Sequence, residues 1–368
     1  MNRAGPAAIH IKEARVRSFL EQNDLDAMLI GRKDNFAWFT CGGNNEVVKP
    51  TEAGFAVLVI TRDGARMIAH VMDGRRIIDE ELNGYDLEYT PVRWYDGQLL
   101  EKAALLIRNM RVISDVFCEG ATYDPRTIQN MHYPLTDMEL QRLKKLGSIT
   151  DRVLRSIAEE IKPGMREVDV AAMLLSEYTS RGIACDVLLI GSDERVSKYR
   201  HPVPSEKPIQ RHVLLHPAIC GWGLHANVTR QVYFNSVPEE IERRYDAACR
   251  IQAASIAQCV PGRRFQDILE VQKRLYEETG YADEWRNHFQ GAVTGYILAD
   301  PTPSLDPHAC ISANQAYDWF ITITGVKVEE LSINTGDSRE VCSASGQWPT
   351  KRYSCDGQVF GLPQILVR

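Results

Sequence analysis

The sequence lacks several features that would place it in a specialised class of protein. None of its nine cysteines stands in a Cys-x-x-Cys pair, so neither a disulfide framework nor a structural zinc site is indicated. It has no basic cluster, and its net charge is −6 with a pI near 5.9, which argues against a surface for nucleic acid or anionic membrane. These absences predict a cytoplasmic protein whose partners are a small molecule or a second copy of the chain.

Long hydrophobic runs are also absent. The longest apolar runs, such as the one from Phe55 to Ile60, have the length of a strand and are far too short to span a bilayer. The N-terminal residues lack the apolar core of a signal peptide. With 368 residues, 44% hydrophobic and 25% charged, the composition is that of a globular protein large enough for two domains.

The residues around Tyr133-Pro134 divide the chain, which predicts one domain over residues 1–134 and another over residues 135–368. In the first, helical periodicity from Ile11 to Asn23 precedes a buried strand at 27–30, an aromatic strand at 35–40 and a strand at 54–60. Strands that alternate with helices predict a small α/β domain.

The second domain begins with a helix. Thr136 lies three residues before Glu139, the spacing of a capping box in which each residue satisfies a polar group of the other. The amphipathic run that follows ends at Pro163-Gly164, because proline cannot continue a helix and glycine relaxes the backbone.

A similar helix–turn–helix pattern occurs twice in this domain. Residues 161–182 and 259–280 match in Pro, Gly, Arg, Asp, Tyr and Gly at a constant offset of 98 residues. Two related units predict an internally duplicated domain.

The most specific pattern lies between Leu214 and Tyr233, LLHPAICGWGLHANVTRQVY, where His216 precedes Asn227 by eleven residues. This segment resembles the metal-binding hairpin of the metallopeptidase superfamily with the pita-bread fold, which includes Xaa-Pro aminopeptidases, prolidases and the metal-free amidinohydrolase creatinase. In the peptidases both positions are aspartates. The resemblance extends to residues 24–40, which are similar to the N-terminal domain of creatinase and prolidase. It also implies that the two halves of the second domain are related by a pseudo-twofold axis.

The resemblance implies five metal ligands, of which two are present. His288 stands before a glycine in Arg286-Asn287-His288-Phe289-Gln290-Gly291, and Glu329 stands in Gly325-Val326-Lys327-Val328-Glu329. Phe320 occupies the aligned place of a family glutamate, in Asp318-Trp319-Phe320. Because a neutral amide is a poor ligand and an imidazole cannot bridge two metals as a carboxylate does, the sequence predicts an α/β protein of this fold without the dinuclear metal site and without a cofactor.

His201, in Lys198-Tyr199-Arg200-His201-Pro202, lies shortly before the hairpin, where the resemblance implies a catalytic histidine. A histidine of near-neutral pKa transfers protons, and Glu329 could orient it or receive a cationic group of the substrate. We predict His201, His288 and Glu329 as catalytic residues. The predicted substrate contacts are His216, Asn227, Thr229, Arg230, Phe289, Tyr296, Phe320 and Trp222.

Three functions remain open at this stage. The first is a metal-independent hydrolase or lyase that cleaves a C–N bond of a small amide, guanidino or heterocyclic compound. The second is a catalytically silent binding protein on a peptidase fold. The third is a mononuclear metal enzyme with His216, His288 and Glu329 as ligands. The resemblance also implies a homodimer in which the loop over residues 41–49 borders the partner's site.

Overall fold

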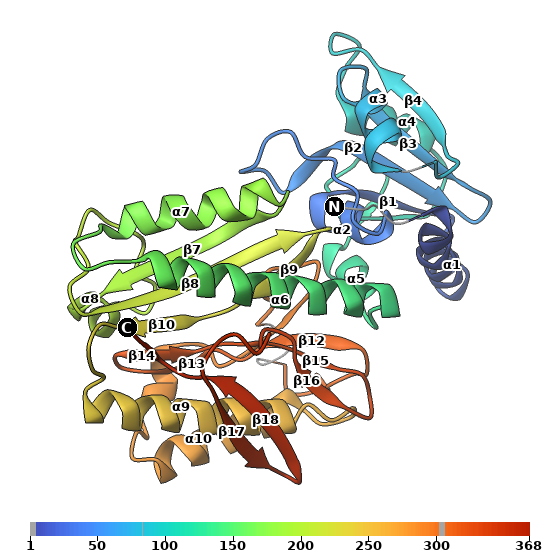
Figure 1. Cartoon of the computed structure of the whole chain (residues 1–368). Helices are drawn as coiled ribbons and strands as arrows, with labels where there is room; N and C mark the ends of the chain where they lie inside the picture. Colours follow the sequence, from blue (N-terminus) through green and yellow to red (C-terminus); the bar gives the residue numbers. More distant parts are fainter. Residues whose placement is uncertain (1–4, 83, 302–305) are drawn as a thin grey trace. The chain divides into compact units, whose positions relative to one another are not determined.

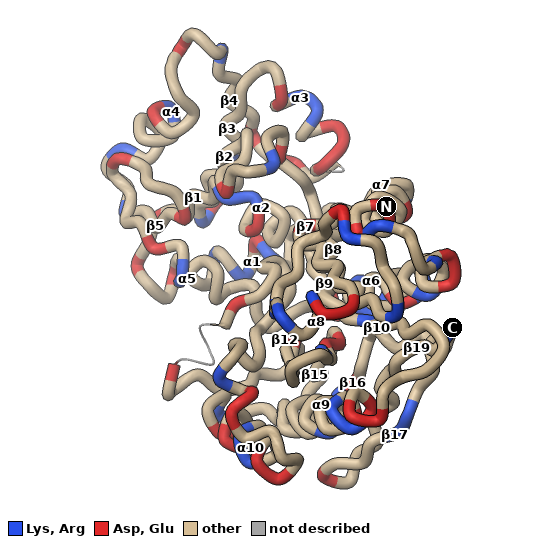
Figure 2. The backbone as a smooth tube through the Cα atoms, turned by 90° about the vertical axis from the view of Figure 1, so that its left-hand side faces the viewer, with Lys and Arg blue, Asp and Glu red and all other residues tan. Residues whose placement is uncertain are grey.

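The computed structural model describes residues 5–82, 84–301 and 306–368, and the chain forms two compact units. Unit 1 covers residues up to Tyr133, and unit 2 covers Pro134–Arg368 (Figure 1). Basic and acidic residues are interspersed in both units (Figure 2). No helix within the described ranges has the length and apolar character needed to cross a membrane.

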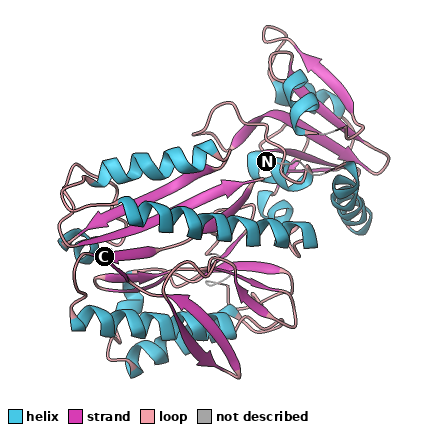
Figure 3. Cartoon of the chain, viewed as in Figure 1, coloured by secondary structure: helices cyan, strands magenta, loops and turns pink. Residues whose placement is uncertain are grey.

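Unit 1 is built on a six-stranded mixed sheet with the order β4-β3-β2-β1-β5-β6 (Figure 3). The helices α1 and α2 pack on strands β1 and β2, and α4 packs on β2 and β3. The elements of this unit are α1 (Pro6–Gln22), β1 (Ala27–Arg32), α2 (Lys33–Phe39), β2 (Ala53–Thr61), β3 (Ala65–His70), α3 (Gly74–Arg76), η1 (Ile77–Glu81), β4 (Glu88–Val92), α4 (Leu99–Leu106), β5 (Val112–Ser114), β6 (Thr122–Tyr123) and α5 (Pro125–Asn130).

The prediction of an aromatic strand over residues 35–40 is wrong, because α2 occupies this segment. The buried carboxylate of Asp115 accepts hydrogen bonds from the backbone N–H groups of Gly31, at 2.6 Å, and Arg32, at 3.2 Å. It also accepts from Nδ2 of Asn35, at 2.8 Å. Asp115 therefore satisfies the donors at the end of β1 and the start of the helix, where the ladder to β2 also shifts register.

Unit 2 contains two helix pairs and the strands that follow each of them. The elements are α6 (Asp137–Glu160), α7 (Glu167–Ser180), β7 (Ala184–Ser192), α8 (Glu194–Lys198), β8 (His212–Gly221), β9 (Leu224–Asn227), β10 (Arg230–Tyr233), α9 (Glu239–Ala257), α10 (Phe265–Glu278), the 3-10 helix η2 (Glu284–Asn287), β11 (Ala292–Thr294), β12 (Gln315–Asp318), β13 (Ile321–Ile323), β14 (Val326–Val328), β15 (Leu331–Asn334), β16 (Arg339–Val341), β17 (Thr350–Cys355), β18 (Gln358–Pro363) and β19 (Leu366–Val367).

The helix pairs α6–α7 and α9–α10 lie on opposite sides of the central strands of unit 2, whereas the β17–β18 hairpin lies beside α9 (Figure 1). α6 packs on β8 and β9, whereas α9 packs on β13 and β14. The predicted capping box is confirmed, since Thr136 N–H donates to Glu139 Oε2 at 2.7 Å and Glu139 N–H lies 3.4 Å from Thr136 Oγ1. The repeated turns precede α7 and α10 in equivalent places, as the predicted duplication requires.

The hairpin identified in the sequence is formed by β8 and β9. Asn227 pairs with Ala218 across the ladder, and His216 lies two residues further along β8. Because alternate residues of a strand share a face, the side chains of His216 and Asn227 point to the same side of the hairpin.

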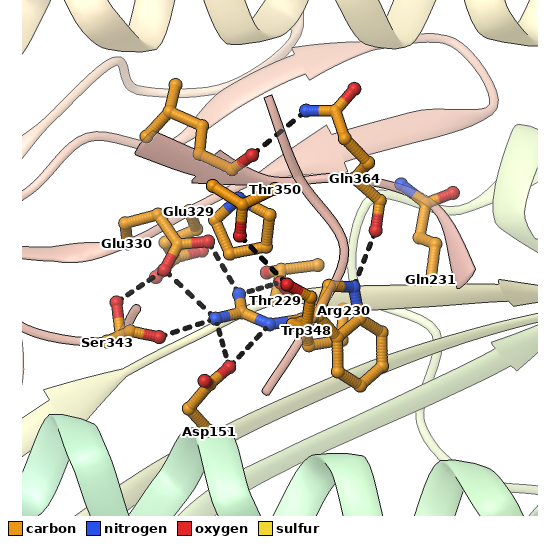
Figure 4. A network of polar contacts seen from close by, with 12 residues as sticks. Asp151, Thr229, Arg230, Gln231, Glu329, Glu330, Ser343, Trp348, Thr350 and Gln364 are labelled. Carbon is orange, nitrogen blue, oxygen red and sulfur yellow. Dashed lines mark hydrogen bonds and ion pairs between the residues drawn. The ribbon is translucent and has the colours of Figure 1, made fainter. Parts of the chain in front are cut away.

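A fully buried ion-pair network holds the two halves of unit 2 together (Figure 4). The Arg230 guanidinium, on β10, donates to Asp151 of α6 at 2.7 and 3.1 Å. It also donates to both carboxylate oxygens of Glu330, at 2.5 and 3.2 Å, and to the carbonyl oxygens of Thr229 and Ser343. Every guanidinium nitrogen thus has an acceptor, which offsets the cost of burying the charge.

We expect Arg230→Met to lower the free energy of unfolding by about 3–5 kcal/mol, because it leaves the Asp151 and Glu330 carboxylates buried without their cation. Urea unfolding of the full chain, followed by circular dichroism, measures this loss. The matched control is Arg243→Met on α9, whose arginine is exposed and pairs with Glu239 and Glu240; it should change stability by less than about 1 kcal/mol. Equal effects of the two substitutions would contradict the role given to the network.

Candidate functional site

The candidate site lies in unit 2, and two imidazoles face each other at its exposed side. His201 follows α8, His288 follows η2, and their Nε2 atoms lie 3.0 Å apart. His288 Nδ1 lies 2.6 Å from the carbonyl oxygen of Phe289 and therefore carries a proton that it donates there. With both rings neutral, His288 Nε2 is an acceptor, so His201 donates from Nε2 and keeps a free lone pair on Nδ1.

A buried charge pair lies deeper in the same site. Lys327, on β14, and Glu329, just after it, are two residues apart and share a face of the chain. Lys327 Nζ lies 2.9 Å from Glu329 Oε2, with the lysine 4% and the glutamate 0% exposed. The backbone carbonyl of Lys327 accepts from Gln231 Nε2 at 3.1 Å, which fixes this strand against β10.

His216 and Thr229 connect the hairpin to this charge pair. His216 Nδ1 lies 3.0 Å from Thr229 Oγ1 and 3.5 Å from Glu329 Oε2. The Thr229 N–H donates to the carbonyl oxygen of Glu329 at 3.0 Å. The imidazole of His216 therefore stands beside the glutamate in the place where the resemblance implies an aspartate.

Asn227 and Asp318 form a second buried pair. Asn227 Nδ2 donates to Asp318 Oδ2 at 2.6 Å and to the carbonyl oxygen of Leu298 at 3.1 Å. Both side chains are buried, and the other oxygen of each, Asn227 Oδ1 and Asp318 Oδ1, has no hydrogen-bond partner among the described residues. These two polar atoms have unused hydrogen-bonding capacity.

The electrostatics keep the imidazoles neutral. Burial, followed by the positive charge of Lys327, lowers the pKa of His288 to about 4 and also lowers the pKa of His201. The same two causes hold the pKa of His216 well below its usual range. At neutral pH all three rings are therefore uncharged and can accept a proton.

The two carboxyl groups differ in their protonation. Burial raises the pKa of Glu329, and the adjacent ammonium of Lys327 opposes this shift. Burial and then the charge of Glu329 raise the pKa of Asp318 well above its ordinary value. The arrangement favours an ionised Glu329 paired with Lys327 and a protonated Asp318 beside Asn227.

Aromatic rings cover one side of the site. The buried ring of Phe320 lies 5.6 Å from that of His288 and 4.9 Å from that of Phe289, which is 47% exposed. Lys327 Nζ lies 5.8 Å from the centre of the Phe320 ring. Gly291 lies two residues after Phe289. A Cβ at this position would stand 2.2 Å from the ring of Trp319, so only glycine allows the backbone to pass this close to the ring.

The structure brings together seven of the predicted residues in this site: His201, His216, Asn227, Thr229, His288, Phe320 and Glu329, with Phe289 at its edge. Other predicted residues are placed elsewhere. The guanidinium of Arg230 is fully engaged in the buried network, and Trp222 lies at the hairpin tip, where Arg142 and Lys145 of α6 stand over its ring. Tyr296 is buried after β11.

The expected orientation of His201 by Glu329 is not what the structure shows. Among the contacts of the described residues, His201 pairs with His288, and Glu329 pairs with Lys327 and His216. The reason is that Lys327 is on the same strand face as Glu329, so its ammonium lies next to the carboxylate. His201 is in a loop and pairs with His288 instead.

The sequence interpretation missed Lys327 and Asp318. The alternation of Lys327 and Glu329 in a strand was a usable signal, because it places both side chains on one face. For the family glutamate, the interpretation chose Phe320, but the carboxylate that reaches the hairpin from this segment is that of Asp318, at the end of β12. Which carboxylate reaches the hairpin depends on the direction of the side chains at the end of β12, and a sequence alignment does not show that direction.

The residues present do not fit the dinuclear metal centre that the resemblance implies. The hairpin supplies His216 and Asn227 where two carboxylates would bridge the metals, and the Lys327 ammonium lies against Glu329. A cation at this carboxylate would have to stand beside that positive charge. Within the described ranges, the ligand atoms of His216, His288 and Glu329 also do not all lie within 4.8 Å of one another.

Sequence comparison with known proteins identifies relatives over most of the chain. The model of metallopeptidase family M24 matches residues 141–326. An uncharacterized peptidase of Staphylococcus epidermidis is 22% identical over 287 residues, which are 74% of this chain and 80% of that protein. An Xaa-Pro dipeptidase of Pyrococcus horikoshii is 23% identical over 300 residues, 77% and 81% of the two chains.

Solved structures share the fold. An Xaa-Pro dipeptidase from Bacillus anthracis has a TM-score of 0.75 at 17% identity and covers 98% of this chain and 100% of its own. A prolidase from Pyrococcus horikoshii has a TM-score of 0.74 at 18% identity, with coverage of 90% and 98%. The N-terminal domain of a FACT complex subunit from Cicer arietinum (chickpea) has a TM-score of 0.67 at 9% identity, with coverage of 92% and 97%.

These likenesses confirm the predicted α/β class, with a small N-terminal domain and a C-terminal pita-bread domain. The matched residues 141–326 make up half of the sequence and include the hairpin, both imidazoles of the surface pair and Asp318. The chain belongs to metallopeptidase family M24.

Proposed function

We propose that this protein is a hydrolase of a C–N bond in a small amide, guanidino or heterocyclic compound, and that it works with side-chain groups in place of a metal pair. The observation that supports this is the buried Lys327 ammonium, 2.9 Å from Glu329 Oε2, in the site where relatives would hold metal. A fixed positive charge in a water-poor site stabilises developing negative charge on a substrate oxygen or nitrogen, which is the role that a Lewis acid would otherwise fill.

In this proposal His201 is the general base and then the general acid. Its free Nδ1 takes a proton from water, the water oxygen bonds to the substrate carbon, and negative charge develops opposite the Lys327 ammonium. The C–N bond then breaks as the Nδ1 proton passes to the leaving nitrogen. His288 holds the His201 ring through the Nε2 contact at 3.0 Å, while Glu329 pairs with Lys327 and holds it in place.

The substrate contacts in this proposal are the groups with unused polar atoms or exposed rings. Asn227 Oδ1 and Asp318 Oδ1 are buried and have no hydrogen-bond partners among the described residues, and Phe289 offers an exposed ring beside Phe320. We assign Arg230 to the frame of the site, because its donors are all taken. The dipeptidase relatives suggest small dipeptides as one set of compounds to assay.

A catalytically silent binding protein is the second candidate, since the same fold occurs in a FACT complex subunit. It differs from the first in one measurable respect. A binding protein would retain a compound unchanged, whereas the hydrolase releases an amine or ammonia from it.

We expect His201→Ala to lower turnover of the best substrate by about 10²–10⁴-fold, the usual contribution of a positioned acid–base group. The assay measures amine or ammonia release from a panel of small amides, guanidino compounds, heterocycles and Xaa-Pro dipeptides. The control is His308→Ala, an exposed histidine of unit 2 outside the site, which should leave turnover unchanged. Equal activity of wild type and His201→Ala would exclude the assigned role.

Turnover should also persist after dialysis against a chelator, because no step of the proposed reaction uses a metal. The same panel assay, repeated with and without added Zn²⁺, Mn²⁺ or Co²⁺, tests this expectation. Activity that disappears on chelation and returns with one of these ions would replace the proposal with a metal-dependent reaction.

Lys327→Met should raise the pKa values of His201 and His288, because burial then remains but the positive charge that also disfavours their protonated forms is removed. Since the base must be neutral, the acid limb of the activity profile moves to higher pH by a similar amount. NMR titration of the histidine ring protons measures both values directly. Lys351→Met, which removes an exposed lysine paired with Asp246, is the matched control, and unchanged midpoints in Lys327→Met would show that its charge does not act on the pair.

A further inference from the structure

A second group of potential ligands lies on the hairpin, outside the site described above. Asp186 of β7, Cys220 of β8 and His225 of β9 place one ligand atom each within 4.8 Å of one another. No other such group occurs among the described residues. None of the three stands at a position where the family resemblance implies a metal ligand.

Sheet register explains why residues so far apart in sequence meet here. Cys220 and His225 are directly paired across β8 and β9, and Ala184 pairs with Cys220 across β7 and β8. The β7–β8 ladder shifts register between Cys185 and Val187, so Asp186 is the residue at the irregularity. Such bulges redirect a side chain relative to a regular strand, and here the carboxylate reaches the His225 ring on the neighbouring hairpin.

The His225 ring is held in the orientation that a metal ligand needs. Its Nδ1 lies 2.9 Å from the carbonyl oxygen of Gly295 and therefore donates a hydrogen bond there. Nε2 donates to Asp186 Oδ2 at 3.1 Å, so a metal ion that binds at Nε2 would displace this proton. Histidine ligands commonly donate their second ring N–H to a backbone carbonyl or carboxylate, which fixes the ring and leaves the other nitrogen for the metal.

We propose that Asp186, Cys220 and His225 form a binding site for a divalent cation of the zinc class. A thiolate, an imidazole and a carboxylate are the three ligand types that zinc binds in proteins, whereas magnesium and calcium prefer oxygen alone. The His225 residue is 9% exposed and the Asp186 side chain is 43% exposed, so the buried ring anchors the ion and the open side leaves a fourth position to water. The thiol proton of Cys220 is released when the ion binds.

None of the three ligands is a residue of the proposed hydrolytic chemistry. Cys220 and His225 lie toward the tip of the hairpin, whereas His216 and Asn227 lie toward its base. The inference therefore does not depend on the proposed function, and binding measurements alone can test it.

The test uses full-length protein, dialysed first against a chelator and then titrated with Zn²⁺ by calorimetry and with Co²⁺ by absorption spectroscopy. We expect one equivalent to bind and Co²⁺ to give a thiolate charge-transfer band. Cys220→Ser should abolish the band, and both Cys220→Ser and Asp186→Asn should weaken Zn²⁺ binding at least about tenfold. Asp186 is exposed, so Asp186→Asn should fold normally and tests the site even if Cys220→Ser disturbs the fold.

Cys185→Ser is the matched control, because Cys185 is the neighbouring thiol on β7 and donates to the carbonyl oxygen of Val187 outside the cluster. It should keep the Co²⁺ band and the Zn²⁺ affinity of the wild type. Zn²⁺ binding that survives in both Cys220→Ser and Asp186→Asn would overturn the proposal. So would loss of the Zn²⁺ in His288→Ala with retention in Cys220→Ser, since the ion would then bind at the imidazole pair.

Discussion

The arrangement of unit 2 depends on the buried guanidinium of Arg230, which links Asp151 of the first helix pair to Glu330 and Ser343 of the second half. Arg230 follows Thr229, and Glu330 follows Glu329, so the same ion pairs fix the backbone of two residues of the site. The hydrogen bond from Thr229 to Glu329 joins these segments directly. Because unpaired buried charges are strongly destabilising, a relative displacement of the two halves would be costly. The buried ion pairs therefore fix the positions of Thr229 and Glu329 relative to each other.

Within that frame, one lysine is central to the electrostatics of the candidate site. Lys327 lies against Glu329, and its charge adds to burial, the larger cause, in lowering the pKa values of His201, His216 and His288. The site consequently has an exposed part with two neutral imidazoles and a buried part with one ion pair. In a metallopeptidase of this family the metals would supply the positive charge. Here a side chain can do so, which is the physical basis of the proposed metal-independent reaction.

The hairpin β8–β9 serves two different clusters along its length. Toward its base it presents His216 and Asn227 to the buried carboxyl groups, and toward its tip it places Cys220 and His225 beside Asp186. A two-stranded ladder with fixed register can do this because every second residue shares a face. The tight turn at Gly221–Gly223, with Trp222 at positive φ, sets that register.

Local patterns in the sequence determined the α/β class, the start of α6 at its capping box, the repeated helix pairs and the hairpin, because each depends on residues close together in the chain. Through the resemblance they also predicted most of the residues that the structure brings together in the candidate site. Only the tertiary structure decided which of these residues interact. The pairing of Glu329 with Lys327, the contact of Asp318 with Asn227, the enclosure of Arg230 and the Asp186–Cys220–His225 cluster depend on strand register, a bulge and burial, which bring together groups that sequence spacing does not connect.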